Sequence, residues 1–433
     1  MSRRRAMVLV RFWLLVLLAA PFAAGPAAAQ GGTGVATTQW PTLADQVGNS
    51  DDFTAEGLTA LNARMREAVE KGEVAGLAHI LLKDGEVVTF DMWGAQSFGG
   101  PPITEETIYR IRSMTKPIVG VAMMQLYEQG LWRPEDPITK FLPEMANLRV
   151  VVDPADLSNT VPVTRAPNMN ELMTHTAGFG YGLSAANAVD RAFQEDSPSS
   201  RPDLDGVVSR TAEIPLLFQP GERWSYSIAV DLQGAIVERL TGQSLGEYLE
   251  EHIFGPLGME DTGFAVPEAD RGHFATVSQR NSQTAEHAVY PDAYSFFERT
   301  TAESGGGGLV STTHDYARFA QMLLNEGELD GARILDPASI ALMMTNHIGD
   351  LRGVFGGGGF GYGGRVVTAA PENGIGEPVG SFSWFGIDGT WMWIDPVNDL
   401  AYIGMIQRRG GGGQGAVNFR GESPVLVYGA LRR

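Results

Sequence analysis

The stretch Ser113-Met114-Thr115-Lys116 contains one of only four lysines in the 433-residue chain, three positions after a serine. Residues i and i+3 share one face of an α-helix, so a helix that begins near Ser113 brings the hydroxyl and the amine within interaction distance. Pro117 supports that start, because a missing N–H is harmless only in the first turn. Free N–H groups at the helix start can also stabilise an oxyanion. The motif therefore predicts a serine nucleophile beside an amine.

The residues after this motif predict a buried central helix. Residues 118–126 are apolar nearly all round, and Gly130 is suited to cap the end of the helix. A lysine at the mouth of a buried helix is partly desolvated, which lowers its pKa from the ordinary ~10.4 toward neutrality. The alternative is a capping serine followed by a solvated lysine, because S-x-x-K also occurs by chance.

Strand patterns come from both ends of the chain. Residues 75–83 and 86–93 are β-rich runs joined by Asp84-Gly85, a hairpin turn signal, and residues 390–395 and 400–407 also read as strands. Most of residues 113–345 carries helical patterns, and residues 424–431 read as a final helix. We therefore predict an α/β fold of the α+β type. One antiparallel sheet is built from both chain ends and flanked by helices, and a mostly helical second subdomain lies between them.

The N-terminus has the pattern of a secretory signal peptide, residues 1–29. Three arginines at positions 3–5 precede the apolar run 12–20 and the cleavage site Ala27-Ala28-Ala29. We expect an exported protein, periplasmic or secreted, in which residues 30–50 form a linker. The sequence does not decide between the general secretion route and the twin-arginine route. The apolar run is too short to span a bilayer comfortably, so no stable membrane insertion is expected after cleavage; an uncleaved anchor is the alternative.

Charge and composition exclude several classes of partner and site. Loss of residues 1–29 removes four arginines and no acid, which takes the formal net charge from −19 to −23. Nucleic acid and anionic membranes are therefore not expected as partners. The chain has no cysteine, and its seven histidines lack metal-ligand spacing. We expect no metal and no cofactor.

A second serine motif, Gly242-Gln243-Ser244-Leu245-Gly246, fits the G-x-S-x-G elbow of α/β-hydrolases. That elbow requires a preceding strand, but residues 231–240 have helical periodicity. Ser244 and Glu247 instead form an S-x-x-E capping box. We expect Ser244 to cap a helix. A histidine-based triad stays open, although Lys116 already offers a base.

Several further segments occur in the order typical of one family. They are residues 126–131, 136–143, 172–178, 220–222, 226–227 and 254–259. With Ser113 to Lys116 they make residues 51–433 resemble the serine β-lactamase and penicillin-binding-protein superfamily. The chain is most similar to class C β-lactamase-like carboxylesterases, the family VIII esterases. The resemblance implies a β-lactamase/DD-peptidase-like fold, with a mixed part (51–115 and about 300–433) and a mostly helical part (about 116–300).

The resemblance also implies roles for individual residues. Ser113 is similar to the family's nucleophile, Lys116 to its activating partner, and Tyr226 to the tyrosine that helps take and return the proton. Whether Lys116 or Tyr226 accepts the proton stays open. Trp384-Phe385-Gly386 is similar to the Trp-x-Gly strand of the esterase branch. The N–H of Ile387 then pairs with that of Ser113 as the oxyanion hole, bordered by Trp384 and Gly386.

Two departures from β-lactamases bear on the substrate. Ile228 stands where β-lactamases have the asparagine of Tyr-x-Asn, and no lysine follows Lys140, so their Lys-Thr-Gly motif is missing. That lysine would recognise a substrate carboxylate, a contact worth about 1.5–3 kcal/mol. The resemblance therefore implies a carboxylesterase that acts through an acyl-enzyme on small neutral esters. The alternatives are a class C-type β-lactamase, a D-Ala-D-Ala carboxypeptidase and a noncatalytic penicillin-recognising protein. The natural substrate, any β-lactam turnover and the oligomeric state stay open.

Overall fold

The computed structural model describes residues 40–432, apart from 48–49, 282, 285, 292–294, 299, 301 and 411–416. Residues Gln39–Arg433 form one compact unit. The predicted signal peptide, residues 1–29, lies outside the described residues, as do positions 30–39 and 48–49 of the predicted linker. Within the described part, no helix combines the length and the apolar character needed to cross a membrane.

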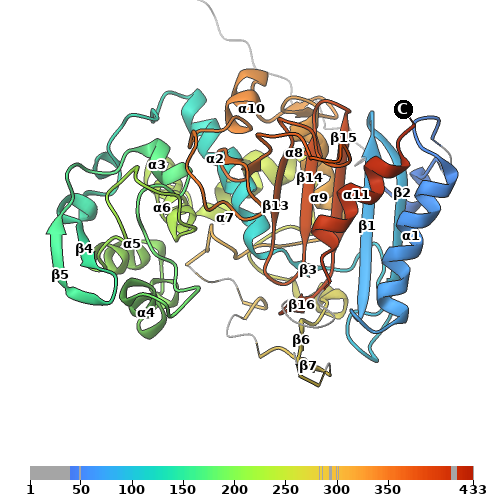
Figure 1. The fold of residues 1–433 in the computed structure, drawn as a ribbon, viewed down its shortest axis with the longest axis horizontal. Coiled ribbons are helices and arrows are strands. Elements are labelled where there is room, and N and C mark those ends of the chain that lie inside the picture. Colours follow the sequence, from blue (N-terminus) through green and yellow to red (C-terminus); the bar gives the residue numbers. More distant parts are fainter. Residues whose placement is uncertain are drawn as a thin grey trace, which may run out of the picture. The chain divides into compact units, whose positions relative to one another are not determined.

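A seven-stranded antiparallel sheet has the order β11-β12-β13-β14-β15-β1-β2 (Figure 1). Its strands are β1 (Gly76–Lys83), β2 (Glu86–Gly94), β11 (Gly359–Phe360), β12 (Arg365–Val366), β13 (Phe382–Phe385), β14 (Trp391–Asp395) and β15 (Leu400–Met405). Both residues of the β1–β2 turn, Asp84 and Gly85, have positive φ, as a two-residue hairpin turn of type I′ requires. Since β1 pairs with β15, the predicted sheet from both chain ends is confirmed.

Different helices cover the two faces of this sheet. On one face, α1 (Ala55–Glu70) and α11 (Phe419–Ala430) pack on alternate strand residues such as Leu77 and Leu81. On the other, α9 (Thr313–Leu324) contacts β1, β14 and β15, and Ile80 joins the main core. Because successive side chains of a strand point to opposite faces, the near-continuous apolar sequence of β1 contributes to the hydrophobic core on each face of the sheet.

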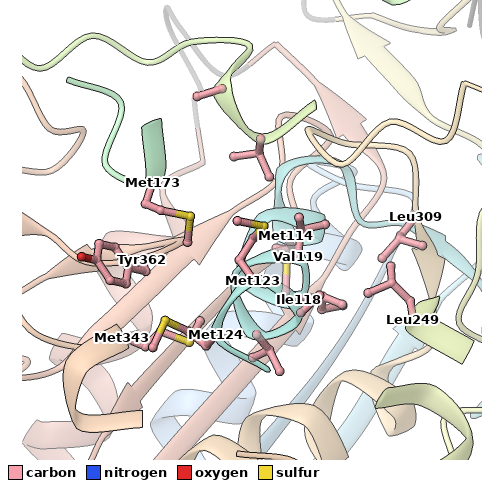
Figure 2. Packing of buried hydrophobic residues seen from close by; sticks show 14 of the residues in the cluster. Met114, Ile118, Val119, Met123, Met124, Met173, Leu249, Leu309, Met343 and Tyr362 are labelled. Carbon is pink, nitrogen blue, oxygen red and sulfur yellow. The ribbon is translucent and has the colours of Figure 1, made fainter. Parts of the chain in front are cut away.

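The buried central helix is α2 (Thr115–Glu128). Figure 2 shows Met123 and Met124 of this helix among side chains from other segments, including Met173, Met343 and Tyr362. Gly130 ends it with φ +76° and an N–H that donates to the Tyr127 carbonyl at 2.9 Å, as predicted. The start differs from the prediction. A 3-10 turn, η2 (Arg112–Met114), holds Ser113, and the α-helix begins at Thr115.

Short helices dominate the chain between α2 and the second half of the sheet. They are α3 (Met169–Met173), α4 (Ala188–Glu195), α5 (Leu204–Glu213), α6 (Ala229–Thr241), α7 (Leu245–Leu249) and α8 (Gly255–Leu257), with α10 (Pro337–Met343) later in the chain. A hairpin of β4 (Arg149–Asp153) and β5 (Asp156–Pro162) was not predicted. Nearly all of β5 is exposed, and its apolar residues Leu157, Val161 and Pro162 do not alternate with polar ones, so the strand carries no period-two signal.

Small strand pairs hold the remaining loops. They are β3 (Tyr109–Arg110) with β8 (Val310–Ser311), β9 (Glu328–Leu329) with β10 (Ala332–Arg333), and β6 (Ser278–Arg280) with β7 (His287–Val289) and β16 (Arg408–Arg409). The β3–β8 pair fixes the chain immediately before η2. It therefore sets where the Ser113 turn begins.

The last helix begins earlier than predicted. The sequence predicted a final helix over residues 424–431. The observed helix α11 begins at Phe419, and Asn418 caps it by accepting the Gly421 N–H at 3.3 Å. Pro424 lies inside the helix, so the Asn418 cap was the stronger start signal.

Ser244 caps α7, as predicted. Its hydroxyl accepts the Glu247 N–H at 3.2 Å, and the Glu247 carboxylate accepts the Ser244 N–H at 3.0 Å. The preceding segment is the helix α6, which ends at Thr241 with Gly242 in the left-handed region. The strand that a nucleophile elbow requires is therefore replaced by a helix.

Ser244→Ala should lower the free energy of unfolding by about 1 kcal/mol, because an α7 backbone N–H loses its acceptor. Ser244→Asn, which keeps a capping oxygen, should restore most of that loss. Denaturant unfolding of both variants measures the difference. Loss of all enzymatic turnover by a fully folded Ser244→Ala protein would contradict the capping role.

Candidate active site

Ser113 and Lys116 meet where η2 passes into α2. The Lys116 Nζ lies 3.3 Å from the Ser113 Oγ, so the predicted juxtaposition of hydroxyl and amine is present. Lys116 is 0% exposed, whereas Ser113 is half-buried and lines an open cavity. The amine is therefore held away from water while the hydroxyl stays within reach of a ligand.

Groups from three other segments surround the side-chain nitrogen of Lys116. Its Nζ donates to the Gly306 carbonyl and lies 3.4 Å from the Tyr181 Oη. It also lies 4.6 Å from the centroid of the Tyr226 ring and 5.2 Å from that of Tyr181. Tyr181 therefore lies directly against the lysine.

Burial lowers the pKa of Lys116 to about 7, and the negative charge of Asp231 acts in the opposite direction. A substantial fraction of the side chain is then a neutral amine near pH 7. A neutral amine beside a hydroxyl can accept its proton, which is the requirement for an activated serine.

Asp231 was missed by the sequence reasoning. This buried acid on α6 accepts hydrogen bonds from the Ser304 hydroxyl at 2.5 Å and the Gly306 N–H at 3.2 Å. It thereby holds the same loop whose carbonyl receives Lys116. Burial raises the pKa of Asp231, while Ser304, Lys116 and Gly306 lower it. An acidic residue inside the apolar run 229–237 was the available signal.

Tyr226 lies beside the pair, as predicted. Its Oη is buried and has no hydrogen bond of normal geometry among the described residues. Burial raises the pKa of Tyr226, although nearby Ser113 and Trp384 lower it in part. The phenol is therefore neutral at pH 7 and can donate its proton or pass it on.

His175 is a structural residue of this region. Its Nδ1 lies 2.9 Å from the Ser227 Oγ and accepts the Ser227 N–H at 3.2 Å, so it holds the segment next to Tyr226. Burial, with a smaller effect of Lys116, puts the pKa of His175 well below its usual range. Because Nδ1 already accepts a backbone proton and the ring stays neutral, a histidine triad through His175 is disfavoured.

The Trp-x-Gly segment at the end of β13 also lines the cavity. Trp384 is 2% exposed and its ring lies 5.5 Å from that of Tyr226, so it both packs under its neighbours and lines the cavity. A Cβ on Gly386 would come within 2.5 Å of the Ile111 carbonyl, so only glycine allows this approach. Ile387 and Ser113 line the same cavity, and neither backbone N–H has a hydrogen-bond partner among the described residues.

The cavity has a volume of about 550 Å³. Its apolar lining comes from Leu183, Phe355, Phe385 and the residues above, and Arg112, Arg409 and Arg420 add positive charge. Such a volume accommodates a small-molecule ligand, and an apolar wall with a few polar groups is typical of ligand pockets.

This fold and this site define a class of protein: a β-lactamase-type fold with an S-x-x-K pair whose serine lines the cavity and whose lysine is buried behind it. Residues 61–423 match the Beta-lactamase family, and the chain belongs to that family. Protein Rv1367c of Mycobacterium tuberculosis (strain ATCC 25618 / H37Rv) is 36% identical over 80% of this chain and 88% of its own length. Esterase EstB of Burkholderia gladioli is 30% identical over 79% and 88%, respectively. The solved structure of EstCE1, a hydrolase with promiscuous acyltransferase activity, shares the fold, with a TM-score of 0.70, 24% identity and coverage of 86% and 98%.

The rate of Ser113 labelling by a fluorophosphonate probe should rise as pH increases through about 7, because the neutral amine of Lys116 is the reactive form. Asp231→Asn removes a charge that raises the pKa of Lys116, so the rise should move to lower pH. Labelling rates from pH 5 to 9 on both proteins measure the shift. An unchanged pH profile, or a shift to higher pH, would show that the charge of Asp231 does not raise the pKa of the Lys116 amine.

Proposed function

We propose that this chain is a serine hydrolase that cleaves small neutral carboxylic esters through an acyl-enzyme. The observation that carries the proposal is a desolvated amine 3.3 Å from a hydroxyl that lines a largely apolar cavity. An activated nucleophile of this kind splits one difficult acyl transfer into two easier steps. The esterase name of a relative that is 30% identical to the chain agrees with this reading.

In the first step, the Ser113 Oγ attacks the ester carbonyl and its proton passes to the Lys116–Tyr226 pair. The C–O bond to the alcohol then breaks, and the pair returns the proton to the departing alkoxide. Water next attacks the acyl-enzyme, the same pair accepts its proton, and Ser113 leaves with a proton as the acid is released. The pKa directions favour Lys116 as the acceptor, because burial lowers the pKa of this amine and raises that of the Tyr226 phenol, which then passes the proton on.

The negative charge of each tetrahedral intermediate requires hydrogen-bond donors. The unoccupied N–H groups of Ser113 and Ile387 border the same cavity and are the proposed donors. Gly386 supports this assignment, because its close approach to Ile111 brings the end of β13 against the segment before Ser113.

The charge around the cavity supports a neutral substrate. Two of its three arginines, Arg112 and Arg409, are both paired with the carboxylate of Asp388. Ile228, at the position of the β-lactamase asparagine, is buried and apolar. The exposed side chains at the cavity, such as Leu183 and Ile387, offer contact area to an apolar acyl or alcohol group.

One observation favours the second candidate, a β-lactamase or D-alanyl carboxypeptidase. Arg420 lines the cavity with its guanidinium over the Phe385 ring at 3.7 Å from the centroid. A cation in that place could receive the carboxylate that such substrates carry. We rank this candidate second because the charge comes from a single arginine that already rests on an aromatic ring.

Mass spectrometry of the intact protein mixed with short-chain p-nitrophenyl esters should detect an adduct of one acyl group. Ser113→Ala should give neither the adduct nor release of p-nitrophenol above background, because the attacking oxygen is removed. Turnover that persists in a folded Ser113→Ala protein would contradict the proposed nucleophile. Absence of any fluorophosphonate label on the native protein would favour the noncatalytic alternative.

Matched esters with and without a carboxylate separate the two substrate classes. A neutral butyrate ester should be cleaved at least about tenfold faster than a hemisuccinate ester of the same alcohol, or than a chromogenic cephalosporin. If the charged substrates are preferred, and Arg420→Gln removes that preference, the second candidate is correct. Values of kcat/KM for the three substrates decide between the candidates.

A further inference from the structure

Asp388 is a fully buried acid at the turn between β13 and β14. It is 0% exposed, whereas its neighbour Ile387 is 54% exposed. Turns carry polar side chains mainly toward solvent, and a buried carboxylate is stable only when it is paired. The inward direction of Asp388 therefore calls for an explanation.

Two arginines pair with this carboxylate. The Arg112 Nε donates to Oδ2, and Arg409 donates to Oδ1 at 2.7 Å. Arg112 is itself 8% exposed and has φ +47°, a left-handed backbone that is unfavourable for a non-glycine residue. The Asp388 ion pair holds Arg112 in this conformation, directly before the proposed nucleophile.

The positions of the paired residues connect them to the two proposed oxyanion donors. Arg112 immediately precedes Ser113, and the ψ angle of Arg112 sets the direction of the Ser113 N–H. Asp388 immediately follows Ile387, whose N–H is the other donor. Thr390 adds a second link between the same segments, because its hydroxyl donates to the Ile111 carbonyl at 3.2 Å.

We propose that the Arg112–Asp388 ion pair positions the oxyanion hole by fixing the distance and relative orientation of the Ser113 and Ile387 N–H groups. Both residues are positioning residues, since they act through their neighbours. The inference rests on the proposed function, because it assumes acyl transfer to Ser113. Donors that are fixed in advance stabilise the transition state without reorganisation, so their displacement slows the chemical step more than substrate binding.

Asp388→Asn is the primary test. It keeps the shape of the side chain and removes its charge, and kcat on a p-nitrophenyl ester should fall about 10- to 100-fold, with a change in KM of less than about threefold. Phenylboronic acid forms a tetrahedral, negatively charged adduct with an active serine, so its affinity should fall by a similar factor. A purely structural role would lower thermal stability and leave the boronate affinity intact.

Asp395→Asn is the matched control. Asp395 is equally buried, ends β14 of the same sheet, and accepts hydrogen bonds from Tyr428 and Asn398 away from Ser113. This variant should lose stability without the loss of boronate affinity. Equal losses in the two variants would overturn the inference.

Arg112→Met tests the pair if Asp388→Asn does not fold. Asp388 then keeps Arg409 as its partner, so no buried charge is left alone, and the same loss of kcat is expected. Arg112→Lys, which restores a cation, should recover part of it. If the native protein is labelled at Ser113 by fluorophosphonate but folded Arg112→Met keeps the wild-type kcat, the inference is overturned and the proposed function stands. If the native protein is not labelled, the proposed function itself is overturned.

Discussion

The site depends on the removal of one amine from water. Lys116 is enclosed at the start of a helix that is buried on nearly every side, and burial brings its pKa to about 7. Ser113, in contrast, is accessible, because the turn before the helix places the serine hydroxyl at the cavity. A single helix start therefore supplies a base that is dry and a nucleophile that a ligand can reach.

The rest of the fold brings distant segments to that helix start. The sheet pairs β1 with β15, so β13 and its Trp-x-Gly end come from residues almost three hundred positions after β1. Helix α6 contributes Asp231, and the loop before it contributes Tyr226. The site can form only when both chain ends have joined one sheet, since β13 supplies Trp384, which packs against Tyr226 at the cavity.

The features predicted correctly from the sequence are those that local sequence patterns determine. The β1–β2 hairpin followed from Asp84-Gly85, and the Ser113–Lys116 contact followed from helical spacing. Features that depend on tertiary packing were missed. The hydrogen bonds of Asp231 and the ion pair between Arg112 and Asp388 join residues 73 or more positions apart, and a charged residue looks the same in a sequence whether it is solvated or buried. The start of α11 was misplaced because the Asn418 cap outweighed Pro424.

The most direct test of the buried, neutral amine is a titration of Lys116 itself. Four lysines in the whole chain make isotope-labelled lysine side chains resolvable by NMR, and the Lys116→Met variant assigns the signal. This amine should titrate near pH 7, in step with the reactivity of Ser113. A Lys116 signal that titrates near the ordinary value of about 10.4 would contradict this expectation, because no neutral amine would then be available to activate the serine at physiological pH.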